Sequence, residues 1–179
     1  EYSDESIKQY LDENDIPYEY IEDDNEVYDL VARLIDQQNV IGWFSGPMEY
    51  GPRALGARSI IADPRSEDMQ SKVNLKIKFR ESFRPFAPSV LEEHVSEWFD
   101  MDSTSPYMLL VTGVQKDKLL ESAKDTQGFQ KLKVKKSVIP AITHVDNSAR
   151  VQTVSKDQNP RYYKLIHRFY EKTGCPLII

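Results

Sequence analysis

The spacing of apolar residues divides the chain into alternating helices and strands. Apolar side chains recur every three or four positions over 26–38, which predicts an amphipathic helix. The run 40–44 that follows is short and apolar, which predicts a buried strand. A later helix has the best-marked ends, with Asn159 as its N-cap, Pro160 at its first position and Gly174 just beyond its last turn.

Weaker patterns predict the remaining elements. Further helices are expected over 3–14, 67–75 and 92–99, with a helical turn at 53–56. Further strands are expected over 18–21, 59–62, 86–91, 107–114, 138–145, 150–154 and 176–179. The strands over 138–145 and 150–154 could pair as a hairpin. Residues 115–137 are polar and rich in lysine, which predicts a solvated excursion. The alternation indicates a single α/β or α+β domain.

Composition limits the class of protein. With 179 residues, 40% of them apolar, the chain can fill one hydrophobic core. No apolar run approaches the roughly 20 residues that a membrane-spanning helix needs, so no membrane partner is expected. The lone Cys175 excludes an internal disulfide and a cysteine metal site and fits a reducing, cytoplasmic compartment. Because the sequence starts at Glu1 without a leader, we expect it to be a piece of a longer protein.

Charge is distributed unevenly along the chain. Residues 1–26 hold eleven acids against one base, Lys8, a net charge of −10. Subtracting this from the −6 of the whole chain leaves +4 on residues 27–179. We therefore expect an acidic lead-in over 1–26 and a globular domain over 27–179. The acidic lead-in would oppose nucleic-acid phosphates, whereas the basic remainder suits a compact anionic ligand.

The segment GPRALGARS, residues 51–59, superficially resembles a phosphate-binding P-loop. That pattern needs lysine directly after the second glycine, whereas here Ala57 follows and Arg58 comes next, so a nucleoside triphosphatase of that class is excluded. Two interpretations remain. Loop N–H groups with Arg53 and Arg58 could face an anion, or the arginines could pair with Glu49 or Asp63 and brace the loop.

A second basic cluster follows. Its members are Lys72, Lys76, Lys78, Arg80 and Arg84, against Glu81 alone. If residues 76–80 are extended, Lys76, Lys78 and Arg80 share one face and could line a cleft for phosphate groups. The alternative is a solvated edge strand, on which lysines discourage pairing with another chain.

A third candidate lies near the predicted hairpin turn. His144 and Asp146 would share one face of a strand, the minimum geometry for an imidazole oriented by a carboxylate. No third ligand is evident, so no metal site is expected among these residues. We find no histidine that would activate Ser59 or Ser89, which gives no support for a serine hydrolase.

Four segments carry a dense resemblance to a known family. They are GWFSGPMEYGPRALGARSIIADPR, NLKIKFRESFRPFAPSV, PAITHVDNSARVQTV and RFYEKTGCPLII. Together they resemble the C-terminal domain of carbamoyltransferases of the nodulation-protein and antibiotic-biosynthesis type, from about residue 27 to residue 179. That domain is similar to YrdC-like proteins, which make threonylcarbamoyl-adenylate. The resemblance implies a YrdC-like α/β (α+β) fold, with a twisted mixed sheet flanked by helices around a basic pocket.

The resemblance also implies a reaction. Such a domain binds ATP, with Mg²⁺, together with carbamoyl phosphate, and forms carbamoyl-adenylate. A separate N-terminal domain, actin-like in fold and iron-bearing, then transfers the carbamoyl group to an acceptor hydroxyl. The alternative is a non-catalytic RNA-binding module with a YrdC-like fold, which the acidic lead-in opposes.

Several residues take their expected roles from the resemblance. Lys78 and Arg80 match the K-x-R element of YrdC-like proteins, and Arg84 belongs to the same block. Arg150 is similar to a ligand-binding arginine of the family, and with Lys78 and Arg80 it makes the expected catalytic set. The other expected binding residues are Arg53, Arg58 and Ser59, from the GPRALG-x-RS block, and His144.

Two departures from the family pattern stand out. Pro47 occupies a position where the family usually has arginine, so any anion contact from that side chain is lost. The family also continues with an S-x-N element that partners K-x-R, whereas this sequence stops at Ile179. We therefore expect the domain to be incomplete at this end.

Overall fold

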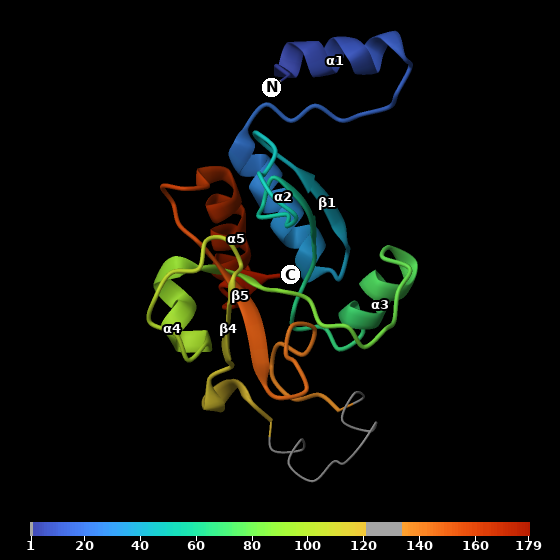
Figure 1. Cartoon of the computed structure of the whole chain (residues 1–179). Helices are drawn as coiled ribbons and strands as arrows, with labels where there is room; N and C mark the ends of the chain where they lie inside the picture. Colours follow the sequence, from blue (N-terminus) through green and yellow to red (C-terminus); the bar gives the residue numbers. More distant parts are fainter. Residues whose placement is uncertain (1, 121–133) are drawn as a thin grey trace.

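A computed structural model describes residues 2–120 and 134–179 of the chain. Within these ranges the centre is a mixed sheet with the strand order β4-β5-β3-β6. The strands are β3 (Ser89–Leu91), β4 (Leu110–Gly113), β5 (Ser148–Val154) and β6 (Leu177–Ile178). β5 runs antiparallel to β4 and parallel to β3, and β6 runs antiparallel to β3. The protein is thus a single α+β domain, as the alternating pattern predicts (Figure 1).

Two long helices pack against each other beside this sheet (Figure 1). They are α2 (Asp24–Asp36), predicted from its apolar spacing, and α5 (Pro160–Thr173), predicted from the residues at its ends. The predicted ends of α5 are confirmed. The Asn159 side chain accepts a hydrogen bond from the Tyr162 backbone N–H at 3.2 Å, and Gly174 adopts a left-handed conformation with φ 73°.

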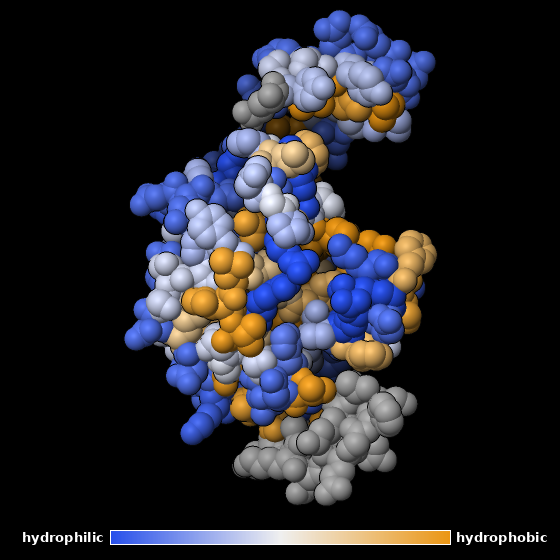
Figure 2. All heavy atoms as spheres, in the orientation of Figure 1, coloured by the Kyte–Doolittle hydropathy of each residue, from blue (hydrophilic) through white to orange (hydrophobic). Residues whose placement is uncertain are grey.

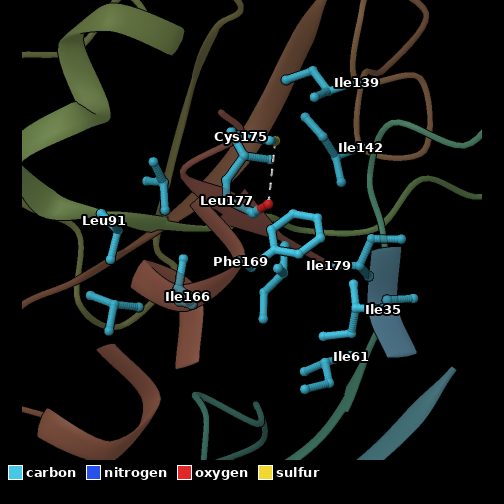
Figure 3. Packing of buried hydrophobic residues seen from close by; sticks show 14 of the residues in the cluster. Ile35, Ile61, Leu91, Ile139, Ile142, Ile166, Phe169, Cys175, Leu177 and Ile179 are labelled. Carbon is cyan, nitrogen blue, oxygen red and sulfur yellow. Dashed lines mark hydrogen bonds between the residues drawn. The ribbon is translucent and has the colours of Figure 1, made fainter. Parts of the chain in front are cut away.

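The hydrophobic core lies where these helices meet the strands. Ile35 of α2, Phe169 of α5 and Ile61 converge there with Leu177 of β6 (Figure 3). Cys175 is buried in the same cluster, where its Sγ donates to the Leu177 carbonyl at 3.5 Å. Burial of these side chains against one another is the main stabilising contribution to the fold.

A two-stranded antiparallel ribbon flanks the core. It consists of β1 (Ile41–Phe44) and β2 (Arg58–Ile61), joined by the glycine-bearing loop 45–57. The Ile179 backbone N–H donates to the Ala62 carbonyl at 3.0 Å, which ties the chain beyond β6 to the chain that follows β2. The ribbon therefore fixes the loop 45–57 to the body of the domain.

The shorter helices lie at the periphery. They are α1 (Asp4–Glu13), α3 (Met69–Lys76), η1 (Glu92–His94), α4 (Val95–Trp98) and η2 (Lys116–Lys118). The first four confirm predicted helices. α1 buries no residue and stands apart from the body of the domain (Figure 1). In the described part of the chain, no helix combines the length and apolarity needed to cross a membrane.

The predicted hairpin over 138–154 is wrong. Residues 138–145 form turns, and β5 pairs with β4 and β3 instead. The run is apolar because it is a buried loop, in which Ile139 and Ile142 face the core. Its polar groups are satisfied locally: Ser137 Oγ accepts from the Ile139 N–H at 3.0 Å, and Thr143 Oγ1 donates to the Ile139 carbonyl at 3.0 Å. The apolar pattern of residues 138–145 thus indicates burial, and it does not indicate a strand.

Two other local predictions are wrong, and the condition set for the second basic cluster is not met. Residues 18–21 are not a strand, and 53–56 contain no helical turn. Residues 76–80 are not extended, because α3 continues to Lys76 and the chain then turns, with Phe79 at φ 49°. The predicted excursion 115–137 begins with η2, and its segment 121–133 lies outside the described residues.

Candidate ligand-binding cleft

A cleft of about 520 Å³ is formed where the loop 45–57, the chain after α3 and the sheet meet. Five of its described lining residues are basic and none is acidic. The basic residues are Arg53, Lys78, Arg80, Arg84 and Arg150. Strongly hydrophilic side chains gather in the middle of the face that Figure 2 shows. The cleft thus presents a concentration of positive charge in a protein whose net charge is −6.

The structure brings together seven of the eight residues expected at a site. The cleft is lined by Arg53, Ser59, Lys78, Arg80, Arg84, His144 and Arg150. They come from segments far apart in the chain, including the loop 45–57, the turn after α3 and β5. The eighth, Arg58, is not among the lining residues. Whether the seven bind a ligand remains a prediction.

The turn after α3 is held by one buried amide. Asn74 is fully buried, and its Nδ2 donates to the carbonyls of Ser82 at 3.2 Å and Arg84 at 2.7 Å. Its Oδ1 accepts from Arg80 Nε at 2.6 Å. All three contacts hold the segment that carries Lys78 and Arg84, so Asn74 fixes the shape of the basic side of the cleft. Sequence reasoning missed Asn74, because its partners Ser82 and Arg84 are set by the turn and not by a local pattern.

The positive charges of the cleft destabilise one another. Burial lowers the pKa of Arg80, and the nearby charge of Arg84 lowers it further. Burial likewise lowers the pKa of Arg150, as does the charge of Arg53. Arg150 Nε is also buried without a hydrogen-bond partner among the described residues. An anion in the cleft would relieve this repulsion and offer acceptors to the guanidinium groups.

The loop 45–57 is braced by its own carboxylate. Glu49 Oε1 accepts backbone N–H groups from Leu55 at 2.8 Å, Ala57 at 2.7 Å and Arg58 at 3.1 Å. Burial raises the pKa of Glu49, but these backbone hydrogen bonds outweigh it and hold the pKa below its ordinary value. The expectation that these N–H groups face a bound anion is therefore corrected, because Glu49 already occupies them.

Arg58 braces the same loop from the other side. Its Nη1 donates to the carbonyls of Gly46 at 3.0 Å and Ala57 at 2.8 Å, and its guanidinium lies 3.4 Å from the centre of the Phe44 ring. The bracing alternative thus holds for Arg58, although its partners are carbonyls and not the carboxylates of Glu49 or Asp63. Arg58 thus braces the loop, and its expected role in binding a ligand stays a prediction.

A buried hydrogen-bonded chain supports the floor of the cleft. Tyr162 Oη donates to Ser89 Oγ at 3.0 Å, and Ser89 Oγ donates to Gln152 Oε1 at 2.9 Å. Gln152 Nε2 then donates to the Leu55 carbonyl at 2.9 Å. Burial raises the pKa of Tyr162 to about 12, so its hydroxyl stays protonated as a donor. These side chains join α5, β3 and β5 to the loop, and their partners lie too far apart in sequence to be predicted from spacing.

His144 is oriented through a serine. Its Nδ1 lies 3.2 Å from Ser148 Oγ, and Ser148 Oγ donates to Asp146 Oδ1 at 2.7 Å. The predicted direct arrangement of His144 and Asp146 on one strand face is wrong, because 138–145 is not a strand and Ser148 stands between them. Burial lowers the pKa of His144; Asp146 raises it, while Arg150 and Lys136 lower it further.

These observations define an α+β domain with a cationic cleft. The chain belongs to the carbamoyltransferase C-terminus family, whose model matches residues 32–179, so the predicted family is confirmed. An uncharacterised protein of Synechocystis is 49% identical over 183 residues, covering 99% of this chain and 30% of the relative.

Nodulation proteins are among the other relatives. NolO of Bradyrhizobium diazoefficiens is 44% identical over 143 residues, covering 78% of this chain and 23% of NolO. Nodulation protein U of Sinorhizobium fredii is 35% identical over 148 residues, covering 83% of this chain and 23% of that protein. The chain spans less than a third of the length of each of these relatives.

Proposed function

We propose that this domain binds ATP and carbamoyl phosphate in the cationic cleft and forms carbamoyl-adenylate. The observation that carries the proposal is the cleft itself, where five basic side chains and no acidic one converge among the described lining residues. ATP and carbamoyl phosphate are both polyanions, and guanidinium groups match their phosphates in geometry and charge. Membership of the carbamoyltransferase C-terminus family supports the same choice of substrate.

The proposed chemistry has two steps. Hydrolysis of carbamoyl phosphate gives carbamate and inorganic phosphate. A carbamate oxygen then attacks the α-phosphorus of ATP, the bond from that phosphorus to the bridging oxygen breaks, and pyrophosphate leaves. Negative charge spreads over phosphate oxygens in both steps, so fixed cations and correct positioning supply most of the catalysis.

Four of the five basic residues of the cleft have a place in this scheme. Lys78 and Arg84 are exposed on the turn after α3 and can follow the phosphates as they enter. Arg80 and Arg150 are partly buried, and Arg80 is held by Asn74, which suits them to stabilise charge that develops at the α-phosphorus. Mg²⁺ would arrive on the ATP phosphates; the described residues form no group of three metal-ligating side chains.

The proposed partner is a separate N-terminal domain that takes the carbamoyl group onto an acceptor hydroxyl. The family description as a C-terminus and the small share of each relative that this chain covers support a partner of this kind. The free thiol of Cys175 suits a cytoplasmic setting, which completes the proposal.

Calorimetric titration with ATP, with and without carbamoyl phosphate, tests the proposal. Lys78→Ala should weaken ATP binding by about 10-fold or more, the effect of losing one charged hydrogen bond. Lys76→Ala is the matched control: it removes the same charge two residues away, from an exposed side chain that does not line the cleft. If the two substitutions weaken ATP binding equally, Lys78 attracts ATP only through its charge and makes no specific contact in the cleft.

A second measurement separates the proposal from RNA binding. A gel-shift titration with structured RNA at two salt concentrations should show no binding that competes with ATP. Tight, steeply salt-dependent RNA binding without ATP binding would replace the proposed function with the RNA alternative.

A further inference from the structure

The contacts of His144 determine which of its ring nitrogens carries a proton. Asp146 accepts two hydrogen bonds at Oδ1, from the Ser148 backbone N–H at 3.1 Å and from Ser148 Oγ at 2.7 Å. Both contacts, the hydroxyl first, lower the pKa of Asp146, so it is a carboxylate and can only accept. The single hydroxyl proton of Ser148 is therefore used on Asp146.

This leaves Ser148 Oγ as an acceptor towards the ring. Its distance of 3.2 Å from His144 Nδ1 is a hydrogen bond only if Nδ1 carries the proton. The neutral ring then has a bare lone pair on Nε2. No described residue hydrogen-bonds to Nε2, and His144 lies on the wall between the cationic cleft and a second cavity beside Lys135, lining both. Burial lowers the pKa of His144 and so favours the neutral ring; the charge of Asp146 opposes this, and those of Arg150 and Lys136 add to it.

A lone pair at this place is chemically distinct from its surroundings. The five basic residues of the cleft offer only N–H donors, which suit phosphate oxygens. Carbamoyl phosphate carries one group that these donors cannot recognise, its amide NH₂. Acetyl phosphate has the same phosphate and carbonyl groups but a methyl in place of that NH₂. An acceptor beside the phosphates can tell the two apart.

We propose that Asp146 and Ser148 hold His144 as the Nδ1–H tautomer, so that Nε2 accepts a hydrogen bond from the carbamoyl NH₂ and selects carbamoyl phosphate over acetyl phosphate. The selectivity rests on the proposed function, whereas the tautomer does not. Ser148 and Asp146 act as positioning residues, and His144 is the residue that contacts the substrate.

The tautomer can be observed directly. Long-range ¹H–¹⁵N correlation spectra of the ¹⁵N-labelled chain at pH 7.5 report which nitrogen of each histidine is protonated. The sequence has three histidines, and the signal that is lost in His144→Gln is that of His144. We expect Nδ1–H for His144. Ser148→Ala should shift it towards Nε2–H, and the exposed Ser103→Ala should not. An Nε2–H tautomer in the unaltered chain would overturn the proposal.

Ligand competition tests the selectivity. The unaltered chain should bind carbamoyl phosphate about 10-fold more tightly than acetyl phosphate, the effect of one added hydrogen bond. Ser148→Ala should keep its affinity for inorganic phosphate but lose most of this preference. Equal affinity of the unaltered chain for the two acyl phosphates would refute the selectivity alone. Failure to bind any of the three ligands would refute the proposed function, while the tautomer would still stand or fall on the spectra.

Discussion

Gly56 offers a direct test of how the loop 45–57 is seated on the domain. Its backbone has φ 105°, a conformation that L side chains rarely adopt. A Cβ placed there would lie 2.3 Å from Cδ1 and 2.7 Å from Cγ of Tyr162. Tyr162 cannot withdraw easily, because its ring is buried and its hydroxyl is bonded to Ser89. Gly56→Ala should therefore strain both the loop and the floor of the cleft.

The size of the effect follows from two separate costs. A residue forced into this backbone conformation costs about 1–3 kcal/mol. Displacing a buried ring to admit an extra methyl group adds about 1–3 kcal/mol. We expect Gly56→Ala to lower the free energy of unfolding by about 2–6 kcal/mol, the range spanned by the two costs together.

The same loop supplies a matched control. Gly51 has φ 118°, and a Cβ added there would meet nothing within 4 Å. Gly51→Ala thus carries the backbone cost without the clash. Urea unfolding followed by tryptophan fluorescence gives both free energies, provided that the denaturant slope is unchanged. If the two variants agree within about 0.5 kcal/mol, the close packing of Gly56 on Tyr162 has no energetic consequence and the reasoning is wrong.

Three further outcomes follow from other buried groups. Asn74→Ala removes three hydrogen bonds and should lower the free energy of unfolding by about 1–3 kcal/mol in urea; an unchanged midpoint would contradict its role in the turn after α3. The pKa of Glu49 is lowered by folding, so its carboxylate stabilises the fold above the ordinary value of 4.5, and this contribution disappears as the pH falls through the lower folded value. Glu49→Gln should therefore be less stable at pH 7 and lose less stability on acidification, as urea midpoints from pH 7 to pH 3 would show, and parallel curves would contradict it. Burial raises the pKa of Cys175 to about 12, so a thiol reagent should label it slowly in the native chain and rapidly in urea; fast native labelling would refute its burial.

The long helices were predictable because each carries its own signal. The apolar face of α2 and the two caps of α5 are readable within a dozen residues, and the fold uses them unchanged. The run 138–145 failed for the opposite reason. Apolar residues mark burial, and a buried loop with side-chain hydrogen bonds, such as that of Ser137 to Ile139, satisfies the same pattern as a strand.

The cleft was predictable in part. Lys78, Arg80 and Arg84 are close in sequence, so their grouping needed no tertiary information. Arg53 and Arg150 were grouped with them only through the family resemblance. The assumption that residues 76–80 are extended placed Lys76 on the same face as Lys78, which the structure does not show. The supporting contacts are the hardest to foresee. Gln152 reaches the Leu55 carbonyl across 97 positions, and no local pattern records such a pair.

The backbone N–H groups of the loop 45–57 that donate to Glu49 have a consequence for ligand binding. Those donors are ordered when the chain folds. The loop therefore loses its conformational entropy during folding, and ordering the loop adds no entropic cost to ligand binding. Association then resembles entry into a rigid receptor, and the loop should keep the same amide hydrogen-exchange protection with and without ligand. The part of the cleft left to adjust is the turn after α3, where exposed Lys78 and Arg84 would lose side-chain freedom on binding the proposed phosphates.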